Sequence, residues 1–283
     1  VGHEFAAEVQ EVGSAVERVR PGDRVAVDPA MSCGKCDQCR AGRPHTCRKL
    51  RFLGCPGQAE GCLSELIVMP DVTCFPVGQN TTYEQAAFVE PLSIGIYAVR
   101  SSVPLRGKRI AILGCGPIGL SVLLPAVAGG AEAVYVTDPI PERLQVAGQA
   151  GATWCGNPTQ QDVVKEIEER EPLLLDAVFE CCGRQEALDQ SVRLLRPGGK
   201  LMLIGIPEVD RISFPIDYLR RREICIQNVR RQNECMEEAV RFSEKHASRI
   251  ETLITHRFGF ADAQAAFDLV ADYRDGVVKA MID

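Results

Sequence analysis

Four cysteines crowd into one short stretch of the chain, and their spacing suits a metal ion. The stretch CGKCDQCRAGRPHTC has the pattern C-x2-C-x2-C-x7-C, formed by Cys33, Cys36, Cys39 and Cys47. Four thiolates at such gaps can surround one zinc ion tetrahedrally, and a site filled by four protein ligands leaves no place for a substrate. The pattern therefore predicts a structural zinc lobe over residues 33–47. An iron–sulfur cluster uses the same ligand type, and four thiols without a metal are the third alternative; His45, inside the loop, is not needed as a ligand.

A glycine-rich turn further along the chain could cradle phosphates. In ILGCGPIGL the pattern G-x-G-x-x-G is formed by Gly114, Gly116 and Gly119, with Pro117 and Ile118 between the last two. The turn follows the apolar run 109–113 and opens a helix-like run, and Asp138 closes the next apolar run 19 residues beyond the third glycine. This is the context that the dinucleotide-binding fingerprint requires. A turn without any ligand is the alternative.

Each residue of this turn has a role in that interpretation. The first glycine permits a tight turn, the second lets the backbone approach a pyrophosphate, and the third lets helix and strand pack closely. The N-terminus of the helix offers unpaired N–H groups and a positive dipole end to the phosphates. Asp138 would accept hydrogen bonds from the ribose hydroxyls and repel a 2′-phosphate, which predicts NAD rather than NADP. Arg143 could lie near the same ribose or the adenine.

The bulk composition excludes several classes of protein. Of the 283 residues, 46% are hydrophobic and the net charge is −6, which gives no electrostatic reason to bind nucleic acid or an anionic membrane. No apolar run reaches the roughly 18–20 residues that a membrane-spanning helix needs. The cysteine count of 13 is odd and unevenly spaced, which argues against a disulfide framework and predicts a reducing, cytoplasmic compartment.

The order of expected elements indicates an α/β protein. Residues 1–100 are expected to form irregular β structure, because short apolar runs alternate there with Gly, Pro and Asp. From about residue 105, apolar runs alternate with helical ones. Strands are expected at 109–113, 133–137, 175–181, 199–205 and 223–229, with helices between them and two amphipathic helices after residue 235. This alternation predicts a Rossmann-type, doubly wound parallel sheet.

Together the motifs resemble a known family over nearly the whole chain. They are GHEFAAEV, GDRVAVDP, the cysteine lobe, FVEPLSIGIYAVR, ILGCGPIGL, DAVFECCG and LRPGGKLMLIG. In this order they are similar to the zinc-dependent medium-chain alcohol dehydrogenases, and within them to the polyol branch of sorbitol and xylitol dehydrogenases. The resemblance implies a partial GroES-like catalytic domain over 1–100, an NAD-binding domain over 101–235 and a return to the catalytic domain over 236–283. It also implies homo-oligomers, dimers or tetramers.

The resemblance further implies a second, catalytic zinc ion. His3 matches the family's ligand histidine, and Glu4 matches the adjacent acid, which in polyol-type members resembles a ligand. Glu90 matches a position that is often cysteine in alcohol-specific members and glutamate in polyol-type ones; we expect it to contact zinc through water part of the time. The implied reaction is hydride transfer from a secondary alcohol or polyol to NAD, giving a ketone or ketose.

The segment NVRRQNE resembles the polyol-branch segment that meets the substrate. Arg230 could donate hydrogen bonds to a hydroxyl-rich substrate, while Arg231 stands where the family usually has an aromatic residue. A surface arginine is the alternative for Arg230.

One departure from the family keeps other functions open. The chain is expected to be N-terminally truncated, starting just before the second zinc ligand, so that the family's first ligand cysteine lies outside it. Its activity is therefore open to question. The alternatives are the zinc-free reductase branch of the same fold and a non-catalytic NAD- and zinc-binding fragment or interaction protein.

Overall fold

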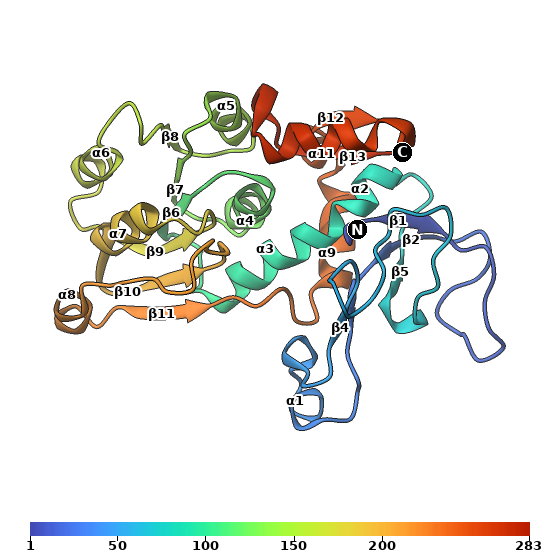
Figure 1. Ribbon diagram of the computed structural model, residues 1–283. Helices are drawn as coiled ribbons and strands as arrows, with labels where there is room; N and C mark the ends of the chain where they lie inside the picture. The colour runs from blue at the N-terminus through green and yellow to red at the C-terminus, as the bar shows by residue number, and fades with distance from the viewer. The chain divides into compact units, whose positions relative to one another are not determined.

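The computed structural model describes residues 1–283 and divides the chain into two compact units, described here one at a time. The first unit comprises Val1–Ile94 and Arg230–Glu251, and the second comprises Gly95–Val229 and Thr252–Asp283 (Figure 1). None of the helices combines the length and the apolar character needed to cross a lipid bilayer.

A small antiparallel sheet forms the centre of the first unit. Its strands, in the order β1-β2-β5, are β1 (Ala6–Glu8), β2 (Arg24–Val27) and β5 (Cys74–Pro76). Val25 and Val27 of the central strand are buried together with Val19 and Cys74. The apolar run RVAV is thus a strand because it has a partner on each edge and a core to pack against.

A second, shorter ladder carries the cysteine loop. It consists of β3 (Ala30–Met31) and β4 (Arg51–Phe52), which pair antiparallel. Between them lie the short helix α1 (Asp37–Arg40) and the 3-10 turn η1 (Pro44–Thr46), and a further 3-10 turn, η2 (Asp71–Thr73), leads into β5. The ladder therefore closes the base of the loop that holds all four lobe cysteines.

Helices complete the first unit, where irregular β structure was expected up to residue 100. They are α2 (Tyr83–Ala87), the start of α3 (Val89–Ser101), which belongs to the second unit from Gly95 on, α9 (Met236–Lys245) and α10 (Ala247–Glu251). Thr82 starts α2 with a capping box: its hydroxyl accepts from the Gln85 N–H at 3.1 Å, and the Gln85 side chain accepts from the Thr82 N–H at 3.1 Å. The expectation of β structure over 83–100 was wrong, because Thr-x-x-Gln at residues 82–85 is a local signal for the start of a helix.

The second unit is built on a six-stranded parallel sheet of order β11-β10-β9-β6-β7-β8. The strands are β6 (Arg109–Leu113), β7 (Ala133–Thr137), β8 (Trp154–Gly156), β9 (Leu175–Glu180), β10 (Leu195–Leu203) and β11 (Cys225–Asn228). In chain order this is the 3-2-1-4-5-6 arrangement of dinucleotide-binding sheets. The expected doubly wound parallel sheet is confirmed.

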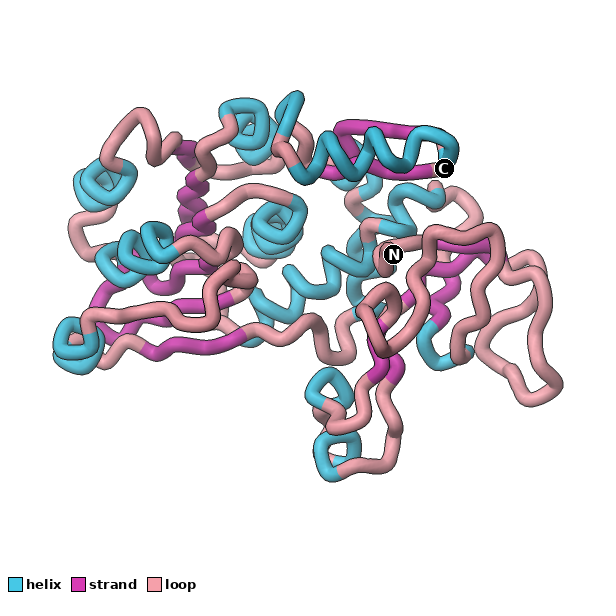
Figure 2. Tube along the Cα trace, viewed as in Figure 1, coloured by secondary structure: helices cyan, strands magenta, loops and turns pink.

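Helices cover both faces of this sheet (Figure 2). They are α4 (Pro117–Ala128), α5 (Pro141–Gln149), α6 (Val163–Arg170), α7 (Gln185–Leu194) and α8 (Ile216–Arg221). Ala111 and Leu113 of β6 lie in one core cluster with residues of α6, α7 and α8, whereas the alternate residues Ile110 and Ile112 are equally buried on the other face. Burial on both faces explains why the strand sequences are continuously apolar.

The last residues belong to the second unit, although 236–283 as a whole was expected to return to the catalytic domain. They form β12 (Ile254–Phe258), η3 (Phe260–Asp262), α11 (Ala263–Ala271), η4 (Arg274–Gly276) and β13 (Lys279–Ile282). β12 and β13 pair with each other in parallel. Arg143 of α5 donates from Nε to the Val277 carbonyl at 2.8 Å, which ties this segment to the second unit, so only 230–251 joins the first.

Candidate active site and metal centres

One cluster of possible metal ligands lies in the first unit. The ligand atoms of His3, Glu4 and Glu90 all lie within 4.8 Å of one another. His3 and Glu4 lie just before β1, from which Phe5 separates them, and Glu90 lies in the first turn of α3. The three residues that the family resemblance singled out, two at the start of the chain and one far along it, are therefore brought together by the fold.

Backbone pairing at the start of the chain holds His3 in place. Cys62 donates its N–H to the Gly2 carbonyl at 3.1 Å, and Leu63 donates to the Val1 carbonyl at 3.2 Å. A Cβ on Gly61 would lie 1.9 Å from the Val1 carbonyl oxygen, so only glycine lets the two segments approach this closely.

Glu90 is the buried member of the cluster, and its chemistry fits a cation. Its side chain is only 4% exposed, and Oε2 has no hydrogen-bond partner. Burial, together with the Asp28 charge, raises the pKa of Glu90 to about 8, although the Arg231 charge lowers it. A buried carboxylate oxygen without a partner is costly unless a cation or donor meets it. An imidazole and two carboxylates around one point are also an open, three-ligand donor set of the kind that catalytic zinc uses.

Arg231, rather than Arg230, faces this cluster. Arg230, which the sequence suggested for substrate binding, is exposed. The Arg231 guanidinium carbon lies 3.3 Å from the centroid of the Phe52 ring, and the His3 ring centroid is 5.0 Å from that of Phe52. The Arg231 backbone has φ 54°, in the left-handed region. Its Nη1 is buried without an acceptor.

Asp28, just after β2, is a further buried carboxyl group near this site. Its Oδ1 accepts from the Ala30 N–H at 2.9 Å and its Oδ2 from Gln232 Nε2 at 2.7 Å. Burial raises the pKa of Asp28 to about 6, although these hydrogen bonds and the Arg231 charge lower it. Sequence analysis missed Asp28, Phe52, Arg231 and Gln232 as parts of a site. The only signal for Asp28 was its place in the GDRVAVDP motif.

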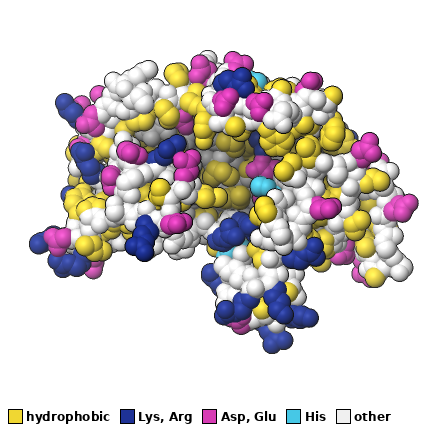
Figure 3. Space-filling model, in the orientation of Figure 1, with side chains coloured by type: hydrophobic (Ala, Val, Ile, Leu, Met, Phe, Trp, Pro, Cys, Tyr) yellow, Lys and Arg dark blue, Asp and Glu magenta, His cyan; other side chains and the backbone are white.

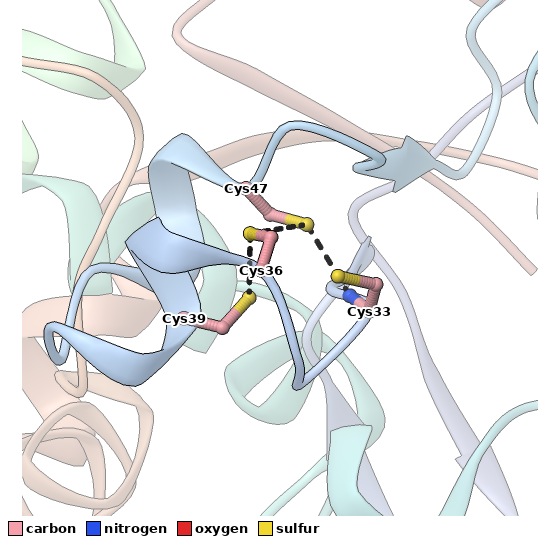
Figure 4. A group of neighbouring side chains, drawn as sticks. All are labelled: Cys33, Cys36, Cys39 and Cys47. Atoms are coloured by element: carbon pink, nitrogen blue, oxygen red, sulfur yellow. Dashed lines mark hydrogen bonds between the residues drawn. The ribbon is translucent and has the colours of Figure 1, made fainter.

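The four lobe cysteines form the second cluster of possible ligands (Figure 4). Their sulfurs lie within 4.8 Å of one another, with Cys36 Sγ 3.5 Å from Cys39 Sγ and 3.8 Å from Cys47 Sγ. Zinc–sulfur bonds of about 2.3 Å in a tetrahedron place the sulfurs about 3.8 Å apart. A disulfide would need about 2.05 Å. The geometry therefore fits four thiolates around zinc, and His45, buried in η1, is not part of the cluster.

Backbone N–H groups of the lobe stabilise negative charge on two of its sulfurs, those of Cys36 and Cys47. Backbone N–H groups of Cys33 and Lys49 each donate to Cys47 Sγ at 3.3 Å. Hydrogen bonds from the backbone of Cys39 and Arg48 lower the pKa of Cys36 to about 6, whereas removal from water and the Cys36 sulfur raise the pKa of Cys39 to about 11. Lys and Arg side chains gather over the lobe (Figure 3), and they include the exposed Lys35, Arg40, Arg43, Lys49 and Arg51.

The glycine turn of the second unit has the geometry of a phosphate-binding loop. Gly114 has φ +92°, and a Cβ on Gly119 would lie 1.9 Å from the Gly114 carbonyl oxygen. At Gly116 the nearest atom to such a Cβ is Arg143 Nη1 at 3.5 Å, so the protein itself leaves this position open. Gly116 is the N-cap of α4, and Pro117 and Ile118 are the first two residues of the helix. No side chain caps this helix end.

Asp138 and Arg143 border the same loop. The buried Asp138 accepts from the Cys115 N–H at 2.8 Å and from the Ile140 N–H at 2.9 Å. Arg143 is buried, with its guanidinium carbon 5.4 Å from the Tyr273 ring centroid. A carboxylate at the end of β7 and a guanidinium across from Gly116 are the two charged groups that a dinucleotide in this loop would meet.

Comparison with known proteins identifies the family. Residues 1–79 match the alcohol dehydrogenase GroES-like domain, and residues 117–245 match the zinc-binding dehydrogenase domain. Sorbitol dehydrogenase of Bacillus subtilis is 32% identical over 100% of this chain and 80% of its own length. This chain belongs to the zinc-binding alcohol dehydrogenase family.

Two further relatives support the same family. L-idonate 5-dehydrogenase of Vitis vinifera is 33% identical over 96% of this chain and 75% of its own length. The crystal structure of a zinc-binding dehydrogenase of Sinorhizobium meliloti bound to NADP is 31% identical, with a TM-score of 0.92 over 99% of this chain and 82% of that one.

These relatives confirm several of the expectations drawn from the sequence. The chain is a zinc-dependent alcohol dehydrogenase of the polyol branch, with a GroES-like domain and a Rossmann-type sheet, and its cofactors are zinc and NAD(P). The alternative of a non-catalytic binding protein is not favoured, because the relatives matched over almost all of this chain are named as polyol and sugar-acid dehydrogenases.

Proposed function

We propose that this dehydrogenase oxidises a neutral polyol at a secondary hydroxyl and uses NAD in preference to NADP. The observation that carries the proposal is that two buried side-chain atoms near this cluster, Glu90 Oε2 and Arg231 Nη1, have no hydrogen-bond partner. One is an acceptor and the other a donor. A substrate hydroxyl group can donate to one and accept from the other, so a chain of neighbouring hydroxyls satisfies both.

The charge of the site favours a neutral substrate. Glu4, Glu90 and Asp28 bring three carboxyl groups, and Arg231 and a divalent ion bring an equal positive charge. No positive charge is left over for a carboxylate or phosphate on the substrate, and placing such a group among buried carboxylates would be unfavourable. We therefore expect the substrate to be a neutral polyol such as sorbitol rather than a sugar acid such as idonate.

We place the catalytic zinc at His3, Glu4 and Glu90, with Glu90 reaching it through water part of the time, and the structural zinc at the four lobe cysteines. Lewis-acid polarisation of the substrate hydroxyl is the chemistry that the catalytic metal supplies when bound. The remaining roles belong to this chain's own side chains. Glu90 is the buried base positioned to receive the hydroxyl proton, Arg231 donates to a neighbouring hydroxyl, and Phe52 keeps one face of the site dry. The alcohol carbon loses a hydride to NAD+ and the proton leaves to water, so the products are a ketose, NADH and H+.

The glycine loop supports NAD as the hydride acceptor. Gly114, Gly116, Pro117, Ile118 and Gly119 would hold the pyrophosphate on the N-terminus of α4. The Asp138 carboxylate would bind the ribose hydroxyls and repel a 2′-phosphate, and Arg143 would lie beside the same ribose.

Two further properties belong to this proposal. All thirteen cysteines are free thiols, which suits a reducing compartment such as the cytoplasm.

β11 lies at the edge of the six-stranded sheet, where a strand of a second copy could extend the ladder, so we propose a homo-oligomer, a dimer or tetramer. Light scattering on a sizing column would measure the subunit number, and a monomer would refute it.

Steady-state kinetics test the function. NADH formation is measured at 340 nm with sorbitol, xylitol and arabinitol, with the sugar acids gluconate and idonate, and with a polyol phosphate, each with NAD and with NADP. We expect kcat/KM to be at least tenfold higher for a neutral polyol than for its acidic counterparts, and higher with NAD. Preference for the sugar acid or the phosphate would overturn the charge argument, and preference for NADP would overturn the role of Asp138.

A further inference from the structure

The segment 230–235, here called the arginine loop, carries Arg231 in an unfavourable backbone conformation. Arg231 and Glu234 both have φ 54°, and neither is glycine. Side chains disfavour this left-handed region, so residues remain in it only where neighbouring groups fix them. Two such residues within four positions mean that the loop would relax if nothing outside it held it.

Two side chains attach the loop to the rest of the unit: Asn233 Nδ2 donates to the Gly42 carbonyl at 3.1 Å, and Gln232 makes the second attachment. Gln232 Nε2 donates to Asp28 Oδ2 at 2.7 Å, and its Oε1 accepts from the Cys235 N–H at 2.9 Å. The Gln232 amide thus fastens the loop to the residue that follows β2 and also closes the loop on itself. Because the two hydrogen bonds have opposite direction, only a side chain with both a donor and an acceptor can make them.

Asp28 is itself fixed and can serve as an anchor. Its Oδ1 accepts from the Ala30 N–H at 2.9 Å, and its own N–H donates to the Thr73 carbonyl at 2.8 Å. Each carboxylate oxygen therefore has one donor, and the side chain has no freedom to follow a moving loop. The anchor belongs to the rigid β2–β3 corner rather than to the loop.

The consequence of this anchoring is the placement of the Arg231 guanidinium. It lies over the Phe52 ring, with its carbon 3.3 Å from the ring centroid, and its Nη1 is buried without an acceptor. A free arginine would turn such a group toward water. We propose that Gln232 and Asp28 are positioning residues that hold Arg231 ready for a substrate hydroxyl, and so set the affinity for the polyol. This inference rests on the proposed function, in which Arg231 donates to that hydroxyl.

A charge swap tests the hydrogen bond directly. In Q232E the new carboxylate keeps an acceptor for Cys235 but faces the Asp28 carboxylate, and in D28N either Ala30 or Gln232 loses its acceptor. In the double variant D28N/Q232E, the amide introduced at position 28 can donate to the carboxylate introduced at position 232, while the bonds from Ala30 and Cys235 remain. We expect each single variant to raise the polyol KM about tenfold or more with little change in the KM for NAD, and the double variant to return within about threefold of the parent. Q160E, an exposed substitution of the same kind, should change neither.

Arginine labelling gives a readout that does not depend on activity. Phenylglyoxal modification, followed by mass spectrometry of the peptide holding Arg230 and Arg231, compares the two neighbours within one molecule. We expect the exposed Arg230 to react faster in the parent, Arg231 to approach its rate in Q232E, and the difference to return in the double variant.

The outcomes separate the two proposals. If the parent oxidises no polyol but the labelling follows this pattern, the proposed function fails and the positioning stands. Unchanged polyol KM and unchanged Arg231 labelling in Q232E would overturn the positioning, even if the variant melts at a lower temperature. Single variants that weaken polyol binding without rescue by the double variant would overturn it as well.

Discussion

Replacing Gly116 by alanine should separate cofactor binding from folding. Gly116 has φ −68° and ψ −168°, which alanine adopts readily, and the nearest atom to the new Cβ is 3.5 Å away. Folding should therefore be unharmed, and the lower entropy of the unfolded chain should add about 0.4–1 kcal/mol to the free energy of unfolding. The methyl group would project into the space assigned to the pyrophosphate. Losing one charge-assisted hydrogen bond there costs about 1.5–3 kcal/mol, which weakens NADH binding by about 10- to 150-fold.

Fluorescence titration measures the affinity for NADH, and thermal denaturation of the same protein measures its stability. Gly119→Ala is the contrasting variant, since its Cβ would lie 1.9 Å from the Gly114 carbonyl oxygen; both folding, by about 1–3 kcal/mol, and NADH binding should suffer. Gly148→Ala, in α5 with no atom within 4 Å, is the control and should bind NADH normally. If Gly116→Ala bound NADH as tightly as the parent, the backbone at this position would not approach the cofactor, and the assignment of the loop would be wrong.

Two other predictions concern the metal centres. Cys39→Ser should lower the zinc content by one ion per chain, measured by plasma mass spectrometry, and it should lower the melting temperature. Cys225→Ser, at the exposed end of β11, should change neither quantity. Full zinc content in Cys39→Ser would contradict the assignment of a zinc ion to the lobe. In the metal-free protein, burial and the Asp28 charge raise the pKa of Glu90 from 4.5 to about 8. The folded state then keeps a proton that the unfolded chain releases, so stability is lost as pH rises from about 4.5 to 8. Glu90→Gln should therefore be more stable than the parent at pH 8 and equal to it at pH 4 in urea titrations, a gain that the exposed Glu65→Gln should not share.

The parallel sheet and both motif-based sites could be foreseen because their information is local. Strands buried on both faces are continuously apolar, and the positions of β6, β7 and β9 follow from that alone. The lobe cysteines and the glycine turn are each contained in one short stretch. Within so short a stretch, the spacing of residues in the sequence largely determines how they are arranged in space. By contrast, the convergence of His3, Glu4 and Glu90 followed from the resemblance to a family, since no local pattern joins residues so far apart.

The rest of the site depends on contacts that no short pattern encodes. Phe52, Asp28 and Gln232 come from three separate segments, and only the folded chain shows that they surround Arg231. No local pattern distinguishes the two adjacent arginines, and only the folded chain shows that Arg231 is the one partly buried on Phe52. The β12–β13 pair was also missed, because ITHRF and KAMI are short and carry charged residues.

The two hydrogen bonds that Asp138 accepts from the Cys115 and Ile140 N–H groups have an evolutionary consequence. The carboxylate that would discriminate between the two nicotinamide dinucleotides also fastens the loop on which either of them must sit. A lineage that exchanges it for a smaller residue to admit a phosphorylated ribose leaves two backbone donors without acceptors in the same step. A change of cofactor would therefore call for a compensating substitution near Cys115 or Ile140, which would make the proposed preference for NAD resistant to single mutations.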